Sequence, residues 1–184
     1  MPMSTIDELF EHNLKDMYGA EQRLLEALEE MAGESVDREA KKAFQQHRKE
    51  TQGQLKRLEK VFKALDLKPE AQPCAGLEGL IKEKKNFAKE RPTEEILNFF
   101  NLHAAQKVER YEITAYEGLI ETAQQLGLDD AVEQLTQNLE EEEQTLNKLK
   151  ALASEYQVEE ADTEDEEEIE VEEERETANV RGKR

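Results

Sequence analysis

The chain has 184 residues and is strongly acidic, with 45 acidic and 25 basic side chains and a formal net charge of −20. This balance disfavours DNA or RNA as a partner, since binding to phosphate backbones depends on clustered Lys and Arg. The sequence has no apolar run as long as a signal-peptide core or a membrane span, and Cys74 is its single cysteine, so we expect a cytoplasmic protein in which Cys74 is an ordinary small residue.

The first predicted helix begins at a capping-box-like pair, Ser4 and Asp7, runs to about residue 32 and ends at Gly33. Its apolar residues follow a 4-3-4-3-4-3 spacing, which marks one face of a helix. That face consists of Phe10, Leu14, Met17, Glu21, Leu24, Leu28 and Met31. Glu21 lies in its middle, and a carboxylate buried among aliphatic side chains must take up a proton or bind a cation.

The second predicted helix covers roughly residues 36–65, and its apolar face contains a histidine. The face consists of Phe44, His47, Thr51, Leu55, Leu58, Phe62 and Leu65. Glu50 lies one turn from His47 on the flank of this face, so the two form a candidate pair of metal ligands. Pro69 and Pro73 end the helix, and a connection of about 27 residues follows. It carries a short amphipathic helix through Leu77, Leu80, Ile81 and Phe87.

The third and fourth predicted helices also carry acids on their apolar faces. Pro92, Thr93 and two glutamates open the third helix, and Gly127 closes it. Its face consists of Leu102, Ala105, Glu109, Glu112, Tyr116, Leu119 and Ala123. Asp129 and Asp130 open the fourth helix, which continues to about residue 156. Its face consists of Leu128, Ala131, Leu135, Leu139, Glu142, Leu146 and Leu149.

Four amphipathic helices of similar length, without a predicted strand, indicate an all-α four-helix bundle over residues 1–156. The long connection between the second and third helices crosses the bundle and carries the short fifth helix, but the spacing leaves the direction of this crossover open. Residues 157–184 hold 13 acidic and 4 basic side chains. Such a segment buries too little apolar surface to fold, so we expect a disordered acidic tail.

The polar residues on the four apolar faces lie at matching depths. Glu21 is 12 residues before Gly33 and His47 is 13 after Glu34, which places both roughly 18 to 20 Å from the turn between their helices. Glu112 and Glu142 each lie 15 residues, or about 22 Å, from Gly127. The predicted metal ligands are therefore Glu21, His47, Glu50, Glu109, Glu112 and Glu142. One histidine and five carboxylates favour iron or manganese over zinc.

Four sequence blocks resemble the YciE/YciF branch of the ferritin-like superfamily over about residues 4–155. The blocks are Asp16-x-Tyr18-x-Ala20-Glu21, Ala43-Phe44-x-x-His47-x-x-Glu50-Thr51, Ala105-Gln106-Lys107-Val108-Glu109-x-Tyr111-Glu112-Ile113 and Leu139-Glu140-Glu141-Glu142. The segment from Cys74 to Leu80 is similar to that branch as well. The resemblance implies a ferritin-like bundle with a crossover, a di-iron site with two ions per chain, a stress association and a homodimer.

The chain departs from the broader ferritin-like pattern at two places. That pattern has Glu-x-x-His on the second helix and often again on the fourth, whereas this chain has the reverse order, His47 before Glu50. On the fourth helix, Thr145 lies three residues after Glu142. Spacing does not tell which carboxylates bridge two ions, and Asp16 and Glu141 are reserve candidates.

Three hypotheses about function follow. The leading one is a di-iron or di-manganese stress protein that oxidises Fe(II) or reduces peroxide or dioxygen, with Tyr18, Tyr111 or Tyr116 as a donor of a proton or an electron or as simple core aromatics. His12 and His103 are interpreted as surface or packing residues. The second is a metal-free bundle that binds partners through its acidic surface and tail. The third is a storage cage, for which the sequence has no sign of shell contacts.

Overall fold

The computed structural model describes residues 2–158, and within them it contains five α-helices and no strand. The helices are α1 (Ile6–Glu34), α2 (Arg38–Ala64), α3 (Ala75–Ala88), α4 (Glu94–Gln125) and α5 (Asp129–Glu155). The predicted all-α class is confirmed, including the short fifth helix in the crossover. No helix in this part of the chain is both long and apolar enough to cross a membrane. The predicted acidic tail lies outside the described residues from position 159 onwards.

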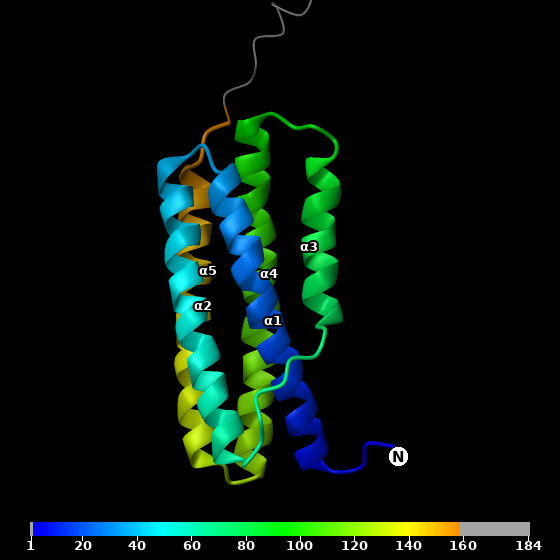
Figure 1. Ribbon diagram of the computed structural model, residues 1–184. Coiled ribbons are helices and arrows are strands. Elements are labelled where there is room, and N and C mark those ends of the chain that lie inside the picture. Colours follow the sequence, from blue (N-terminus) through cyan, green and yellow to red (C-terminus); the bar gives the residue numbers. More distant parts are fainter. Residues whose placement is uncertain (1, 159–184) are drawn as a thin grey trace, which may run out of the picture.

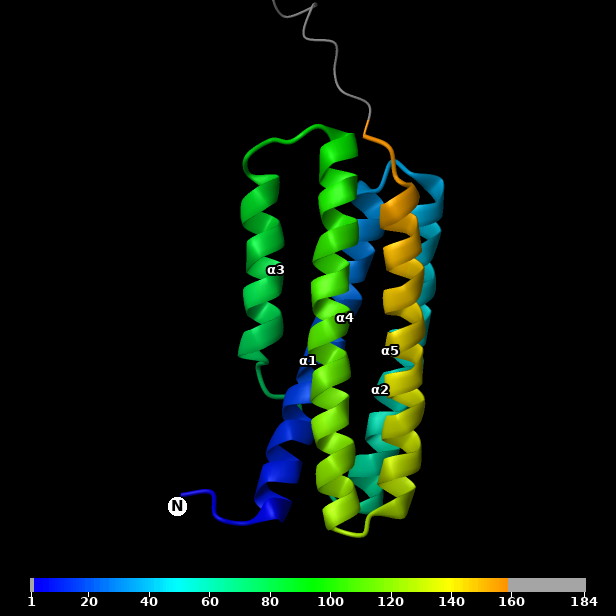
Figure 2. The ribbon, with the colours of Figure 1, turned by 180° about the vertical axis from the view of Figure 1, so that it is seen from behind.

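Four long helices form the bundle, and α3 lies outside it (Figures 1 and 2). Helices α1 and α2 form one antiparallel hairpin, and α4 and α5 form the other. The two hairpins pack through α1 against α4 and through α2 against α5. After α2 ends, the chain returns along the bundle through α3 before α4 begins. Helices α2 and α4 are therefore parallel, which settles the crossover direction that spacing left open.

The starts of α1, α2 and α4 are capped by side chains of the expected types. Thr5, and not Ser4, is the N-cap of α1: its hydroxyl accepts from the Glu8 N–H at 3.2 Å, and the Glu8 carboxylate accepts from the Thr5 N–H at 3.0 Å. The predicted box at Ser4 and Asp7 was therefore wrong by one residue, because the Thr-x-x-Glu sequence allows both bonds of the reciprocal box. Asp37 caps α2, and Thr93 caps α4 as predicted.

Two helices end in the same way. After α4, Gly127 takes the left-handed conformation with φ +69°, and the Leu128 N–H donates to the Ala123 carbonyl at 3.0 Å. After α2, Asp66 takes that conformation with φ 55° and a bond of the same pattern closes the turn. The predicted end of α1 at Gly33 was wrong by one residue, since the helix continues to Glu34.

The crossover is held closely against α1. The Gln72 N–H donates to the Lys15 carbonyl at 3.1 Å. A Cβ atom at Gly19 would lie 2.0 Å from the Gln72 carbonyl oxygen, so only glycine allows the two backbones to approach this far. This contact fixes where the chain leaves α2 and where α3 begins.

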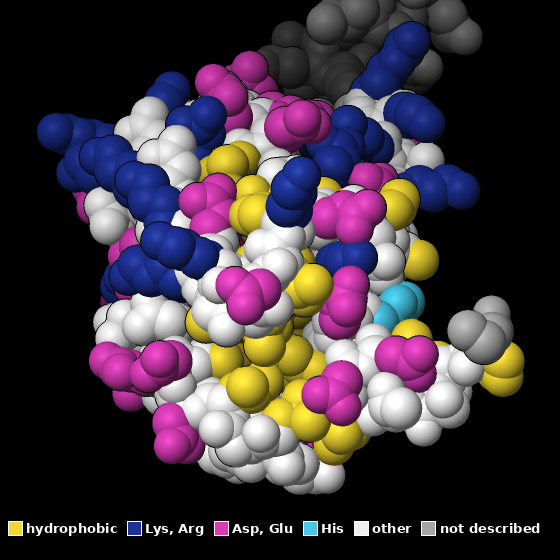
Figure 3. Space-filling view, turned by 60° about the horizontal axis from the view of Figure 1, so that its bottom comes forward, with side chains coloured by type: hydrophobic (Ala, Val, Ile, Leu, Met, Phe, Trp, Pro, Cys, Tyr) yellow, Lys and Arg dark blue, Asp and Glu magenta, His cyan; other side chains and the backbone are white. Residues whose placement is uncertain are grey.

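The interior of the bundle is filled mainly by aliphatic and aromatic side chains, with the largest wholly buried ones being Tyr116, Phe10, Phe44 and Phe62. The surface carries both signs of charge. At the end of the bundle where α2 ends and α5 begins, apolar side chains lie among acidic ones, and Lys and Arg gather elsewhere in the same view (Figure 3). Many surface acids form ion pairs, such as Glu70 with Lys15 and Glu83 with Lys107.

Candidate metal centre

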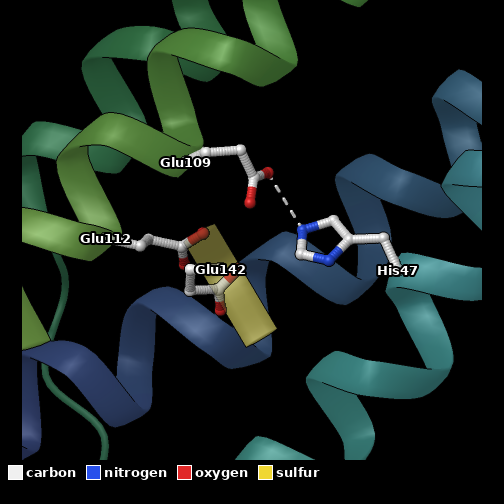
Figure 4. A group of neighbouring side chains, drawn as sticks. All are labelled: His47, Glu109, Glu112 and Glu142. Atoms are coloured by element: carbon white, nitrogen blue, oxygen red, sulfur yellow. Dashed lines mark ion pairs between the residues drawn. The ribbon is translucent and has the colours of Figure 1, made fainter. Parts of the chain in front are cut away.

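Three helices bring four of the six predicted ligands into one cluster, which we name the carboxylate cluster: His47 on α2, Glu109 and Glu112 on α4, and Glu142 on α5. Their nearest ligand atoms all lie within 4.8 Å of one another. The carboxylates of Glu109, Glu112 and Glu142 converge on a common space, and the His47 ring faces the same space from the opposite side (Figure 4).

The carboxylate cluster is wholly enclosed by the bundle. Glu112 and Glu142 are 0% exposed, Glu109 is 1% exposed and His47 is 2% exposed. The i, i+3 spacing of Glu109 and Glu112 places both on the inner face of α4. His47 Nε2 and Glu109 Oε1 form an ion pair at 3.1 Å. Three acids and one base therefore share a site that is closed off from bulk solvent.

Most of the cluster's polar atoms lack a hydrogen-bond partner. Both oxygens of Glu112 and of Glu142, Oε2 of Glu109 and Nδ1 of His47 are buried without one. Buried polar groups in native proteins are almost always paired, and an unpaired buried carboxylate is especially costly. These free oxygens converge on one point, so the donor set fits a cation that prefers oxygen ligands.

The environment opposes ionisation of these acids. Burial, with the nearby Glu21 and Glu109 adding like charge, raises the pKa of Glu112 well above its ordinary value. Burial and the neighbouring acids likewise raise the pKa of Glu142. For His47, burial alone would lower the pKa, but the neighbouring carboxylates of Glu109, Glu21 and Glu50 together outweigh burial, and the net direction is upward. The site therefore favours protons, or a bound cation in their place.

Glu21 lies beside the carboxylate cluster and is held by a separate hydrogen-bonded chain. The Tyr116 hydroxyl donates to Glu21 Oε1, and Asn138 Nδ2 donates to the Tyr116 oxygen at 2.9 Å. Arg57 in turn donates to Asn138 Oδ1 and to Glu141. Burial raises the pKa of Glu21 to about 7, although the Tyr116 hydroxyl acts in the opposite direction. The remaining oxygen of Glu21 has no partner.

Glu50 is the least enclosed of the six predicted ligands, with a side chain 20% exposed. One of its oxygens lies 4.0 Å from His47 Nδ1 and accepts from the Thr145 hydroxyl at 3.3 Å. The other accepts from Gln46 at 3.1 Å and lies 3.5 Å from Lys148 Nζ. Glu50 therefore lies between the cluster and the surface, on the flank of α2 where its spacing placed it.

The other residues singled out in the sequence lie away from the cluster, with one exception. Tyr18 donates to Glu59 at 3.1 Å, and Tyr111 pairs with Cys74 at 3.0 Å, so of the three tyrosines only Tyr116 reaches a predicted ligand. His12 and His103 are exposed, as expected. Cys74 is buried, free and the first residue before α3. The reserve candidates, Asp16 and Glu141, lie beside Cys74 and against Arg57 respectively.

The inner face of α5 differs from the predicted one by part of a turn. Leu139 is only partly buried, whereas Asn138 and Thr145 are buried. The spacing Ala131, Leu135, Asn138, Glu142, Thr145, Leu149 is as regular as the predicted one, and only the polarity of two members concealed it. Arg57 carried no such signal, because it is one of many basic residues along α2.

Comparisons with known proteins place the chain in a family. Residues 5–162 match the family model described as "Domain of unknown function (DUF892)". The chain belongs to the DUF892 family. A curated relative, Protein YciF of Escherichia coli strain K12, is 38% identical to this chain over 154 residues, which is 83% of this chain and 93% of the relative. The resemblance to the YciE/YciF branch is therefore confirmed.

Two solved structures support the DUF892 assignment. The structure of the E. coli stress protein YciF is 38% identical, with a TM-score of 0.78, over 82% of this chain and 96% of that chain. The structure of YcfI from Rhodopseudomonas palustris is 40% identical, with a TM-score of 0.78, over 80% of this chain and 94% of that chain. The bundle and its crossover are thus shared with relatives over nearly their whole length.

Proposed function

We propose that this DUF892 protein is a stress protein that binds two iron ions, or two manganese ions, at the carboxylate cluster. With iron bound, it reduces peroxide or dioxygen, or it oxidises Fe(II) as its substrate. His47, Glu109, Glu112 and Glu142 are the proposed ligands, and Glu21 and Glu50 complete the set on either side. The observation that carries the proposal is the convergence of three wholly buried carboxylates with free oxygens and one histidine on a single point.

The chemistry of the donor set supports iron or manganese. Oxygen-rich sites with one imidazole suit these ions, whereas zinc sites usually contain more nitrogen or sulfur. Ferrous ions, when bound, supply one electron each, so a pair matches the two electrons that reduction of peroxide requires. Glu50 is partly exposed, so it offers a carboxylate at which a cation passing from solvent to the cluster can first bind in place of Lys148.

The protein's own residues hold protons next to this site. The Tyr116 hydroxyl donates to Glu21, and Asn138 donates to the same hydroxyl oxygen. Asn138 is fixed by Arg57, whose other nitrogen pairs with the partly exposed Glu141. This chain fixes the direction in which Tyr116 donates, and it keeps one proton hydrogen-bonded to a proposed ligand. The surrounding aliphatic side chains exclude bulk water from the reaction.

The competing function is that of a metal-free bundle that binds partners through its acidic surface. In such a bundle, protons or basic side chains must neutralise the buried acids. Within residues 2–158, no Lys or Arg forms an ion pair with Glu21, Glu112 or Glu142. Removal of a carboxylate would weaken such a bundle's surface binding little, whereas it would remove a metal ligand. Metal binding by matched variants therefore separates the two functions.

We further propose that the protein is a cytoplasmic homodimer, as the family resemblance implies, and that it does not form a storage cage. Light scattering coupled to size-exclusion chromatography tests the assembly, with a mass of two chains expected. A mass of many chains would support the cage instead.

The reaction is tested by adding peroxide or dioxygen to anaerobic protein loaded with Fe(II) while absorbance is followed. The wild type and a Glu143→Gln control, altered at an exposed neighbour of Glu142, should oxidise iron at the same rate. Glu142→Gln should lose the reaction. Equal rates in all three proteins, or rates equal to that of free Fe(II), would refute the proposed redox centre.

A further inference from the structure

A small apolar cavity lies between α1, α3 and α4, in contact with the carboxylate cluster. Its volume is about 30 Å³, and Glu109 forms part of its wall. The rest of the wall is almost entirely aliphatic, including Leu24, Leu28, Ala104 and Val108. One proposed ligand therefore borders a space that the four-helix bundle alone does not enclose, because Leu80, Ile81 and Lys84 of α3 form part of the wall.

The outer end of this cavity is lined by an ion-paired lysine. Lys84 of α3 is 6% exposed, and its Nζ lies 3.1 Å from Glu30 Oε1 and 2.7 Å from Glu34 Oε2. Asn101 on α4 donates to the same Glu34 carboxylate at 3.0 Å. Glu30 and Lys84 both belong to the cavity wall, as does Glu109, and apolar side chains form the remainder.

The dimensions and polarity restrict what can occupy the cavity. A volume of this size holds about one or two molecules as small as water, so organic substrates are excluded. Water itself is held in cavities by two to four polar partners, and apolar cavities of this kind stay dry and accept apolar guests. Peroxide needs hydrogen-bond partners at both ends, and a cation loses its hydration against aliphatic walls. Dioxygen is small, uncharged and apolar.

We propose that this cavity is a dioxygen-binding site that delivers dioxygen to the Glu109 side of the carboxylate cluster. The role in delivery rests on the proposed metal function, whereas the binding of dioxygen by the cavity does not. The proposal also gives α3 a function: the crossover helix closes the cavity with Leu80, Ile81 and Lys84. Cations and peroxide would have to reach the cluster by another route, such as the flank at Glu50.

The cavity is tested on metal-free, full-length protein by methyl NMR under dioxygen pressure, because dissolved dioxygen is paramagnetic and speeds the relaxation of nearby methyl protons. The expected result is much faster relaxation for the buried methyl groups of Leu24, Leu28 and Val108 than for the buried methyl groups of Leu58 and Leu135 on the far helices. Equal enhancement at all buried methyl groups would overturn the proposal.

A filling variant gives the second test. Ala104→Leu adds three carbons to the cavity wall and should abolish the preferential relaxation at Leu24 and Val108. The matched control, Ala151→Leu, makes the same change at an exposed position on α5 and should retain it. If Ala104→Leu fails to fold, as judged by circular dichroism, Ala104→Val is used in its place. Preferential relaxation that persists in a folded filled variant would contradict the assignment.

Failure of the cavity and failure of the metal centre give different results. Ala104→Leu should bind as much Fe(II) as the wild type in an anaerobic titration, and dioxygen should oxidise its bound iron more slowly. Absence of bound iron in the wild type would refute the proposed function and leave the relaxation result intact. Uniform relaxation with normal iron binding would refute the cavity alone.

Discussion

Replacement of Glu21 by glutamine should stabilise the metal-free protein at high pH and not at low pH. Burial raises the pKa of Glu21 to about 7, compared with 4.5 for an exposed glutamate, which represents the unfolded chain. Between these values the folded protein binds a proton that the unfolded chain has lost. The contribution of the raised Glu21 pKa to folding stability is therefore fully present below pH 4.5 and is lost as the pH rises through 7.

The size of this loss follows from the two pKa values. At about 1.4 kcal/mol for each pKa unit, ionisation of Glu21 in the folded protein costs about 3 kcal/mol at pH 8. Glutamine is nearly isosteric and still accepts from Tyr116, but the neutral hydrogen bond is weaker by about 1 kcal/mol. The net gain for Glu21→Gln at pH 8 is thus about 2 kcal/mol, or roughly 4 to 8 °C in Tm for a chain of this length.

Urea unfolding in the presence of a chelator at pH 4.5 and pH 8 measures this difference. Glu117→Gln, altered at an exposed glutamate on α4, serves as the control and should change the free energy of unfolding by less than about 0.5 kcal/mol at both pH values. The reasoning would be refuted if Glu21→Gln destabilised the protein equally at both pH values, since that result would mean that Glu21 is stably ionised in the metal-free bundle.

Three further predictions follow from the same structure. Gly19→Ala should destabilise the protein by about 1 to 3 kcal/mol, because the new Cβ would meet the Gln72 carbonyl, whereas Gly33→Ala has open space around it and should not destabilise the protein. Equal Tm values for the two variants would contradict the docking of the crossover against α1. Saturating Mn(II) should raise Tm more at pH 8 than at pH 5, since protonated ligands must lose their protons before they bind a metal, and thermal melts showing the reverse order would argue against the carboxylate cluster as the site. Tyr116→Phe should raise the pKa of Glu21 further above 7 in the metal-free protein, because the hydroxyl lowers it, and a carboxyl ¹³C titration in which that pKa falls would be inconsistent with the hydrogen bond.

Much of the fold could be read from periodicity, because a bundle of long amphipathic helices repeats the same signal many times. All seven predicted face residues of α1 are buried, from Phe10 to Met31, with Glu21 among them. The same signal failed locally on α5, where Asn138 takes the inner position that hydrophobicity assigns to Leu139, and Thr145 is buried next to Leu146. Polar residues that are buried as members of a hydrogen-bonded chain cannot be recognised as buried from their residue type.

The site was predicted in part, and the limits are geometric. Matching depth along the helices identified His47, Glu112 and Glu142 as residues of one layer, and the structure places them in one cluster. Depth alone does not determine rotation about the helix axis. The spacing along α2 placed Glu50 on the flank of the apolar face, and the structure shows it there, partly exposed. The pairing of Arg57 with Asn138 depends on the packing of α2 against α5, which no local spacing encodes.

The central claim, that the buried acids exist to hold metal, is tested most directly by an anaerobic Fe(II) titration of metal-stripped protein with bound iron counted per chain. We expect two ions bound per chain in the wild type and in Glu143→Gln, and loss of binding in Glu112→Gln. Binding in the wild type no greater than in Glu112→Gln would contradict it, and the buried carboxylates would then have to be explained as protonated, hydrogen-bonding groups of a metal-free bundle.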